Sequence, residues 1–193
     1  MSPTVESTVP AGTSTGVGAI DRLVEVVGSA DPAALASVLR LTEAPCTNEL
    51  GIGGPPKCGT IDDVPAKEGG VPRSEGTIVE AFPISTCESE WHAEADTIAS
   101  IVGDEPRTLF AVVELDDLTD VHGSGVNIPV THALIFERGD GDGASGMLFA
   151  IDGEHIRYID VLCGGSAAAF LTEPLSEVYG PLEVILRGPA FSG

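Results

Sequence analysis

Apolar residues recur at helical spacing in two stretches near the start of the chain. In the first stretch the positions i, i+3, i+4 and i+7 are held by Ile20, Leu23, Val24 and Val27. This period predicts an amphipathic helix that ends at Gly28. Asp31 and Pro32 are residue types preferred at a helix start, so a second helix is expected to begin there and to end before Pro45. Its apolar positions are Leu35, Val38 and Leu39.

A third helix is predicted after residue 85. Ser85 and Glu88 have the spacing of a capping box, and Gly103 marks a stop. The buried stripe between them consists of Trp91, Ala95, Ile98 and Val102. On the predicted helix, Glu88, His92 and Asp96 recur every four residues and could reach a cation together. We interpret these three residues as a solvated helix face.

Runs rich in β-branched and aromatic residues predict strands over residues 77 to 84, 108 to 115, 130 to 137, 146 to 152 and 155 to 163. Pro83 indicates that the first strand lies at an edge or is ending. Residues 182 to 186 could be a last strand or a partner-binding tail. The predicted class is α+β, with two N-terminal helices and a third helix packed on a curved, mainly antiparallel sheet of five or six strands.

The same pattern predicts the domain organisation. Residues 1 to 16 are rich in Ser, Thr, Pro and Gly and are interpreted as a flexible leader, and residues 17 to 193 as one α+β domain. Residues 46 to 76 hold seven Gly and four Pro and show no period. They are therefore expected to form a long loop within that domain.

Charge excludes several classes of partner. Thirty acidic residues against nine basic ones give a formal net charge of −21, which opposes binding to nucleic acid or to anionic lipid. No apolar run approaches the ~20 residues needed to cross a bilayer, so membrane insertion is not expected either. The hydrophobic fraction of 42% is sufficient for a packed core.

The order helix, helix, strand, helix and then four antiparallel strands resembles the cone-shaped α+β superfamily of nuclear transport factor 2, ketosteroid isomerase and the SnoaL-like polyketide cyclases. The paired helices, the helix around Trp91 and the strands from Thr108 to Cys163 carry the resemblance. It implies a curved sheet around a pocket, which some members use for catalysis and others only for binding, and a homodimer formed through the sheet. No catalytic motif of a member aligns with this chain, so the resemblance assigns no catalytic residue.

Four cysteines allow three disulfide pairings. They form no C-x-x-C pair and no Cys/His cluster with the spacing of a structural zinc site, so metal and redox chemistry are not favoured. We predict the disulfides Cys46–Cys58 and Cys87–Cys163, with free thiols and other pairings as alternatives. Disulfides would place the protein outside the cytoplasm, exported or anchored at the surface, and free thiols would be compatible with the cytoplasm.

Few residues are candidates for a functional pocket. Glu114 and His132 on predicted strands and Tyr158 on the last hairpin could carry acid or base chemistry, and Trp91 could line the same pocket. A hydrogen-bonded core residue is the alternative interpretation of His132. No catalytic residue, metal or cofactor is assigned.

Two functions remain in view. The favoured one is a non-catalytic domain that binds a small apolar molecule or a protein. The alternative is an isomerase, cyclase or hydrolase with a histidine or a carboxylate as general base. Polar groups that converge on His132 would favour an enzyme, and a filled or apolar centre would favour binding.

Overall fold

The structure is a computed structural model that describes residues 14–49, 53–59, 73–139, 145–172, 179–180 and 182–192. Most of the predicted leader, and much of the loop between residues 46 and 76, lie outside the described residues. The helices are α1 (Gly18–Gly28), α2 (Pro32–Ala36) and α3 (Ala95–Val102). The strands are β1 (Thr42–Pro45), β2 (Ile78–Ser85), β3 (Ser89–His92), β4 (Arg107–Glu114), β5 (His132–Arg138), β6 (Ser145–Ile151), β7 (Ile156–Val161) and β8 (Glu183–Arg187).

The strands form one sheet in the order β1-β2-β7-β6-β5-β4-β8, and β3 pairs with β2. All these pairings are antiparallel except the one between β2 and β7. The α+β class and the mainly antiparallel sheet are confirmed, but the sheet has eight strands and not five or six. The additional strands include β1 and β3, which have only four residues each and too few apolar residues to be recognised in the sequence.

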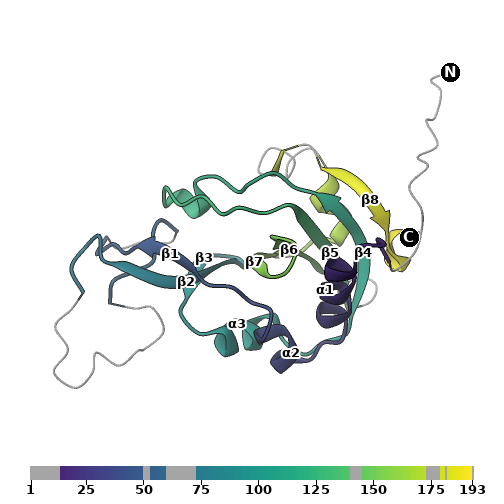
Figure 1. Cartoon of the computed structure of the whole chain (residues 1–193), viewed down its shortest axis with the longest axis horizontal. Coiled ribbons are helices and arrows are strands. Elements are labelled where there is room, and N and C mark those ends of the chain that lie inside the picture. The colour runs from purple at the N-terminus through teal and green to yellow at the C-terminus, as the bar shows by residue number, and fades with distance from the viewer. Residues whose placement is uncertain are drawn as a thin grey trace.

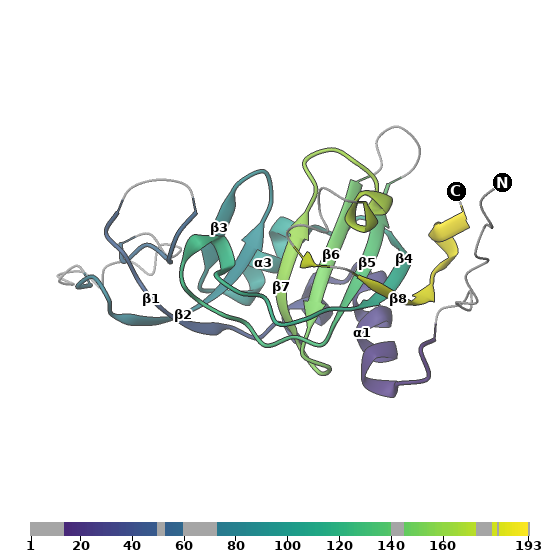
Figure 2. The same cartoon turned by 90° about the horizontal axis from the view of Figure 1, so that it is seen from above.

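Both faces of the sheet are covered. Figure 1 shows the helices on one side and, on the other, the segment that joins β4 to β5 together with the C-terminal region. Alternate residues of a strand belong to different apolar clusters. On β5, for example, Leu134 and Phe136 pack with the helices, whereas Ala133 and Ile135 pack on the opposite side. From above, β4 to β7 lie side by side while β1 to β3 extend at one end (Figure 2).

The N-terminal helices follow the predicted order but differ in length. All four predicted apolar residues of α1 are buried, and the helix ends at Gly28 as expected. The Asp31 side chain caps α2 by accepting hydrogen bonds from the backbone N–H groups of Ala33 and Ala34, at 2.9 and 3.2 Å. The helix then stops at Ala36, because the backbone around Leu39 pairs with Ile156 at the start of β7.

The predicted start of the third helix is wrong. Residues 85 to 92 continue β2 into a hairpin with β3, in which Ser85 and Ser89 are Cα partners, so the capping box does not form. Trp91 and His92 therefore lie on a strand, and α3 begins at Ala95. As a result Glu88, His92 and Asp96 do not share a helix face. The His92 Nε2 atom lies 3.0 Å from a carboxylate oxygen of Glu90.

Pro83 does not mark an edge or an end of its strand. β2 continues to Ser85, and at Ile84 it has β3 on one side and β7 on the other.

Residues 182 to 186, for which the sequence left a strand and a partner-binding tail open, form a strand, because β8 pairs with β4 over this segment. Within the described residues, no helix has the length and apolar character needed to cross a membrane.

Candidate functional site

The parallel pair β2 and β7 brings polar side chains together on the sheet face opposite the helices. Ser85 and Asp160 are Cα partners at the ends of these two strands. The side chains of Ser85 and Tyr179 both hydrogen-bond to the Asp160 carboxylate. Tyr158 is two residues before Asp160 on β7 and shares its face, and its side chain is only 7% exposed. A hydrogen-bonded cluster therefore lies at the ends of two adjacent strands.

His122 approaches this cluster from the long β4–β5 connection. It lies in a tight turn over Val121–Gly123 and has a positive φ of 59°, a conformation that few residues other than glycine adopt. Its ring centroid is 5.9 Å from that of Trp91, which it meets edge-on, and 5.7 Å from that of Tyr158. The His122 ring is thus held between two aromatic side chains that come from β3 and β7.

The ring nitrogens of His122 lack hydrogen-bond partners in the part of the chain that the structure describes. Both are buried, and neither has a hydrogen-bond partner among the described residues. Burial lowers the pKa of His122 from 6.5 to about 4. The ring is therefore neutral at pH 7, with one nitrogen that can donate a hydrogen bond and one that can accept.

These residues surround a pocket of about 350 Å³, which we call the His122 pocket. Its polar lining includes Ser85, Asp120, His122, Tyr158, Asp160 and Tyr179. No Lys or Arg is among the described residues that line it. The volume is at the lower end of the range found for small-molecule sites, ~300–1,000 Å³.

Burial dominates the electrostatics of the cluster. It raises the pKa of Asp160, an effect that the hydrogen bonds from Tyr179 and Ser85 partly oppose. Burial, assisted by the nearby Asp160 carboxylate, also raises the pKa of Tyr158. For Tyr179 the pKa is raised by burial, by Tyr158 and by Asp160. Both tyrosines are therefore neutral hydrogen-bonding groups across the physiological range.

The first disulfide supports the His122 turn. Cys46 and Cys58 are bonded as predicted, with their Cα atoms 4.9 Å apart and both residues buried. The loop they close brings Gly54 against the His122 turn. The Gly54 N–H donates to the His122 carbonyl at 2.7 Å, and Trp91 Nε1 donates to the Gly54 carbonyl at 3.0 Å. This part of the Gly/Pro-rich segment is therefore a structural support of the candidate site.

The second disulfide joins the ends of the two strands that carry the cluster. Cys87 and Cys163 are bonded as predicted, with their Cα atoms 5.2 Å apart. They follow Ser85 on β2 and Asp160 on β7 by two and three residues. Because β2 and β7 share only two register pairs, this disulfide is a main constraint on the distance between the Ser85 and Asp160 side chains.

The four candidate pocket residues fall into two separate places. Trp91 and Tyr158 both contact His122 and belong to the apolar cluster opposite the helices. Glu114 and His132 are Cα partners on β4 and β5, and they line a different, open depression of about 680 Å³. The sequence pattern did not indicate this division.

The depression around Glu114 and His132 is strongly acidic. Asp116, Asp117 and Glu183 also line it, and His132 Nδ1 lies 2.9 Å from the hydroxyl oxygen of the adjacent Thr131. Despite this charge, no group of three or more His, Cys, Asp or Glu side chains in the described part of the chain has the geometry to hold a metal ion.

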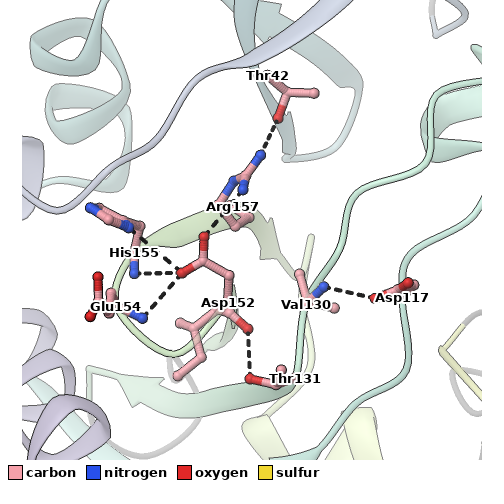
Figure 3. A network of polar contacts seen from close by, with 9 residues as sticks. Thr42, Asp117, Val130, Thr131, Asp152, Glu154, His155 and Arg157 are labelled. Carbon is pink, nitrogen blue, oxygen red and sulfur yellow. Dashed lines mark hydrogen bonds and ion pairs between the residues drawn. The ribbon is translucent and has the colours of Figure 1, made fainter.

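A third polar cluster has a structural role (Figure 3). The Asp152 carboxylate accepts from the backbone N–H groups of Glu154 and His155 at 3.1 and 2.9 Å, and from Arg157 at 3.1 Å. Arg157 also donates to the Thr42 hydroxyl at 3.2 Å, as Figure 3 shows. The cluster thereby fixes the β6–β7 turn and connects it to β1.

Several residues that define the pocket are not among those that the sequence pattern indicates. The pattern predicts Ser85 to be a helix cap and assigns no role to His122, Asp160 or Tyr179. Two signals were available in the sequence. Asp160 has the strand parity of Tyr158, and His122 lies between Asp120 and two nearby glycines, a composition typical of a turn with positive φ.

Comparison of the chain with protein-family models, with curated proteins and with solved structures finds no match. The resemblance to the cone-shaped superfamily therefore stays a prediction.

Proposed function

We propose that this chain is a non-catalytic domain that binds a small molecule in the His122 pocket. The observation that carries the proposal is the state of His122. Its backbone has a positive φ, and both of its ring nitrogens are buried without a partner among the described residues. A ligand in the pocket would supply the missing hydrogen bonds.

The energetic cost of this arrangement supports a functional role. A non-glycine residue at positive φ costs on the order of 1–3 kcal/mol, and a buried polar group without a partner costs a similar amount. Folding stability is small, about 5–15 kcal/mol, so two such costs at one residue are large. Such costs concentrate at binding and active sites, where they position a side chain for a ligand.

Binding is favoured over catalysis by the way in which the polar groups are paired. The Ser85 side chain hydrogen-bonds within the Asp160 and Tyr158 cluster. His122 has no hydrogen-bond partner among the described residues that would orient it as a base. Nucleophilic catalysis needs a nucleophile bonded to a base and a third group that orients that base. The described residues of the pocket do not provide this chain of contacts.

The two disulfides support a proposal about the cellular compartment of the protein. Both are formed, and disulfides persist in oxidising compartments. We propose that the domain belongs to an exported or surface-anchored protein. The homodimer through the sheet stays a prediction.

A ligand screen tests the proposed function. Trp91 is the only tryptophan of the chain, and its contact with His122 makes its fluorescence a reporter of the pocket. We expect members of a library of small cations, neutral molecules and anions to change this fluorescence, and His122→Asn to weaken their binding at least about tenfold.

The matched control is His132→Asn, which makes the same change in the acidic depression and should leave binding unchanged. Asn tolerates positive φ, so His122→Asn is compatible with the turn, and circular dichroism checks that the variant is folded. The proposal is wrong if no library member changes Trp91 fluorescence, or if His132→Asn weakens binding and His122→Asn does not.

A further inference from the structure

We infer that the ligand of the His122 pocket is a small organic cation, an amine whose ammonium group donates hydrogen bonds to Asp160 and His122. The inference depends on the proposed function, because it specifies the ligand of the same pocket. It follows from the hydrogen-bonding inventory, the aromatic walls and the charge of the site.

The pocket has a surplus of acceptors. Two carboxylates, Asp120 and Asp160, line it together with hydroxyl groups and the neutral His122 ring. A carboxylate can accept about four hydrogen bonds. The Asp160 carboxylate accepts from the Tyr179 and Ser85 side chains, which leaves capacity for further donors. A ligand with several N–H donors would complement these groups.

The described lining of the pocket also carries no positive charge of its own. It contains no Lys or Arg, and the contacts that stabilise the Asp160 carboxylate come from neutral hydroxyl groups. A buried carboxylate is costly unless a charge or several hydrogen bonds compensate it. An ammonium group would provide both. An anionic ligand would instead meet two carboxylates, with no basic side chain in the part of the lining that the structure describes.

Aromatic rings provide the second element of recognition. Tyr158 and Tyr179 line the pocket, and Trp91 is next to His122 at its side. The faces of such rings attract cations, with a stabilisation of about 0.5–2 kcal/mol. The neutral His122 ring adds an acceptor nitrogen. The volume of about 350 Å³ limits the ligand to a compact body.

Three ligands of similar size and shape but different charge test the inference. They are 2-phenylethylamine, its neutral analogue 2-phenylethanol, and the phenylacetate anion. Affinities are measured by calorimetry and by Trp91 fluorescence on the whole chain. We expect the amine to bind at least about tenfold more tightly than the alcohol, since hydrogen bonds to a charged group are worth ~1.5–3 kcal/mol, and phenylacetate to bind least.

The Asp160→Asn variant removes the charge and keeps an acceptor for Tyr179. It should bring the ratio of amine to alcohol affinity close to one. Glu114→Gln is the matched control, because it removes one negative charge from the other depression, and the ratio should stay at its original value. Circular dichroism establishes that both variants are folded.

The outcomes separate the two proposals. If the alcohol or phenylacetate binds as well as the amine and His122→Asn still weakens that binding, the cation inference is overturned while the proposed function stands. If the amine preference survives Asp160→Asn, or is lost equally in Glu114→Gln, the inference is overturned as well. If none of the three ligands binds, the cation inference fails, and the wider library then decides the proposed function.

Discussion

His122 is the residue at which strain, burial and chemistry coincide. Its ring is held between Trp91 and Tyr158, and its carbonyl accepts from Gly54. These contacts hold the His122 side chain in a position where water does not solvate its ring nitrogens. The surrounding fold therefore stabilises a backbone conformation and a side-chain position that are both unfavourable for an isolated histidine.

The lowered pKa of His122 predicts how stability depends on pH. Below pH 6.5 the unfolded chain protonates this histidine, but the folded chain does not until pH falls to about 4. The folded state therefore loses stability as pH falls from 6.5 to 4, and this loss does not increase further below pH 4. Since His122 as a whole residue is only partly buried, although its ring nitrogens are covered, we expect a loss of about 1–2 kcal/mol relative to His122→Asn.

Denaturant unfolding of the wild type and of His122→Asn between pH 4 and pH 7.5 checks this prediction. The stability difference between the two proteins should change over this interval and stay constant above pH 7. A difference that is independent of pH would show that the ring is solvated. His132→Asn, treated in the same way, corrects for the removal of a histidine.

Asp152 has a structural role that can be tested separately. Burial raises the pKa of Asp152. The opposite effect of its hydrogen bonds from the N–H groups of His155 and Glu154 and from the Arg157 guanidinium is larger, so the pKa lies below 3.8. The carboxylate therefore stabilises the folded state above pH 4, and this contribution is lost as pH falls through its folded pKa. We expect Asp152→Asn to reduce stability by about 1–3 kcal/mol at pH 7.

The comparison for Asp152→Asn is Asp116→Asn, which removes an exposed carboxylate from the acidic depression. Thermal and denaturant unfolding at pH 7 and at lower pH give the difference in stability between each variant and the wild type. Equal stability of the two variants at pH 7, or an Asp152→Asn effect that grows as pH falls, would contradict the structural role.

At the scale of the elements, the loop closed by Cys46 and Cys58 should be important to the site. A disulfide that closes a loop of about 15 residues stabilises a protein by ~3 kcal/mol in the chain-entropy model, and this loop is slightly shorter. Replacing both cysteines by serine should lower stability by about 2–3 kcal/mol. It should also shift Trp91 emission to longer wavelength, because Gly54 would no longer be held against the indole N–H.

Unfolding and fluorescence spectra of the double serine variant check both parts of this expectation. Emission is recorded under conditions in which the variant is folded by circular dichroism. An unchanged Trp91 spectrum together with reduced stability would show that the disulfide does not support the pocket.

The sequence predicted elements well where one physical pattern dominates. The apolar period of α1 and the β-rich runs of β4 to β7 were sufficient because each is long and buried. The third helix was misplaced because Ser85 and Glu88 satisfy a local capping pattern, while tertiary pairing of β2 with β3 determines the structure of residues 85 to 92. Local spacing cannot reveal such a pairing.

Local patterns also limit what the sequence indicates about the His122 pocket. The sequence indicates Tyr158 as a candidate for acid or base chemistry and Trp91 as a lining residue, and both contact His122. The cluster itself depends on the parallel pairing of β2 with β7, which joins residues 75 positions apart, as in Ser85 and Asp160. The disulfide pairing Cys87–Cys163 was the one long-range constraint that pointed toward it.

For the whole molecule, the formal charge of −21 is the dominant property. Like charges at this density repel one another and destabilise the compact state, and salt screens the repulsion. The melting temperature should therefore rise by a few degrees when NaCl is increased from about 0.05 M to about 0.5 M, since the Debye length falls over this range. A melting temperature that falls with salt would indicate that attractive ion pairs outweigh the repulsion.

The central claim is that the His122 pocket binds a small organic cation, and NMR of the ¹⁵N-labelled chain tests it most directly. A single tryptophan gives a single indole N–H resonance, which belongs to Trp91. Addition of 2-phenylethylamine is predicted to shift this resonance and the ring resonances of His122 together, with one affinity, and to leave the His132 ring unaffected. Shifts confined to His132 and the residues around Glu114, with Trp91 and His122 unchanged, would contradict the claim.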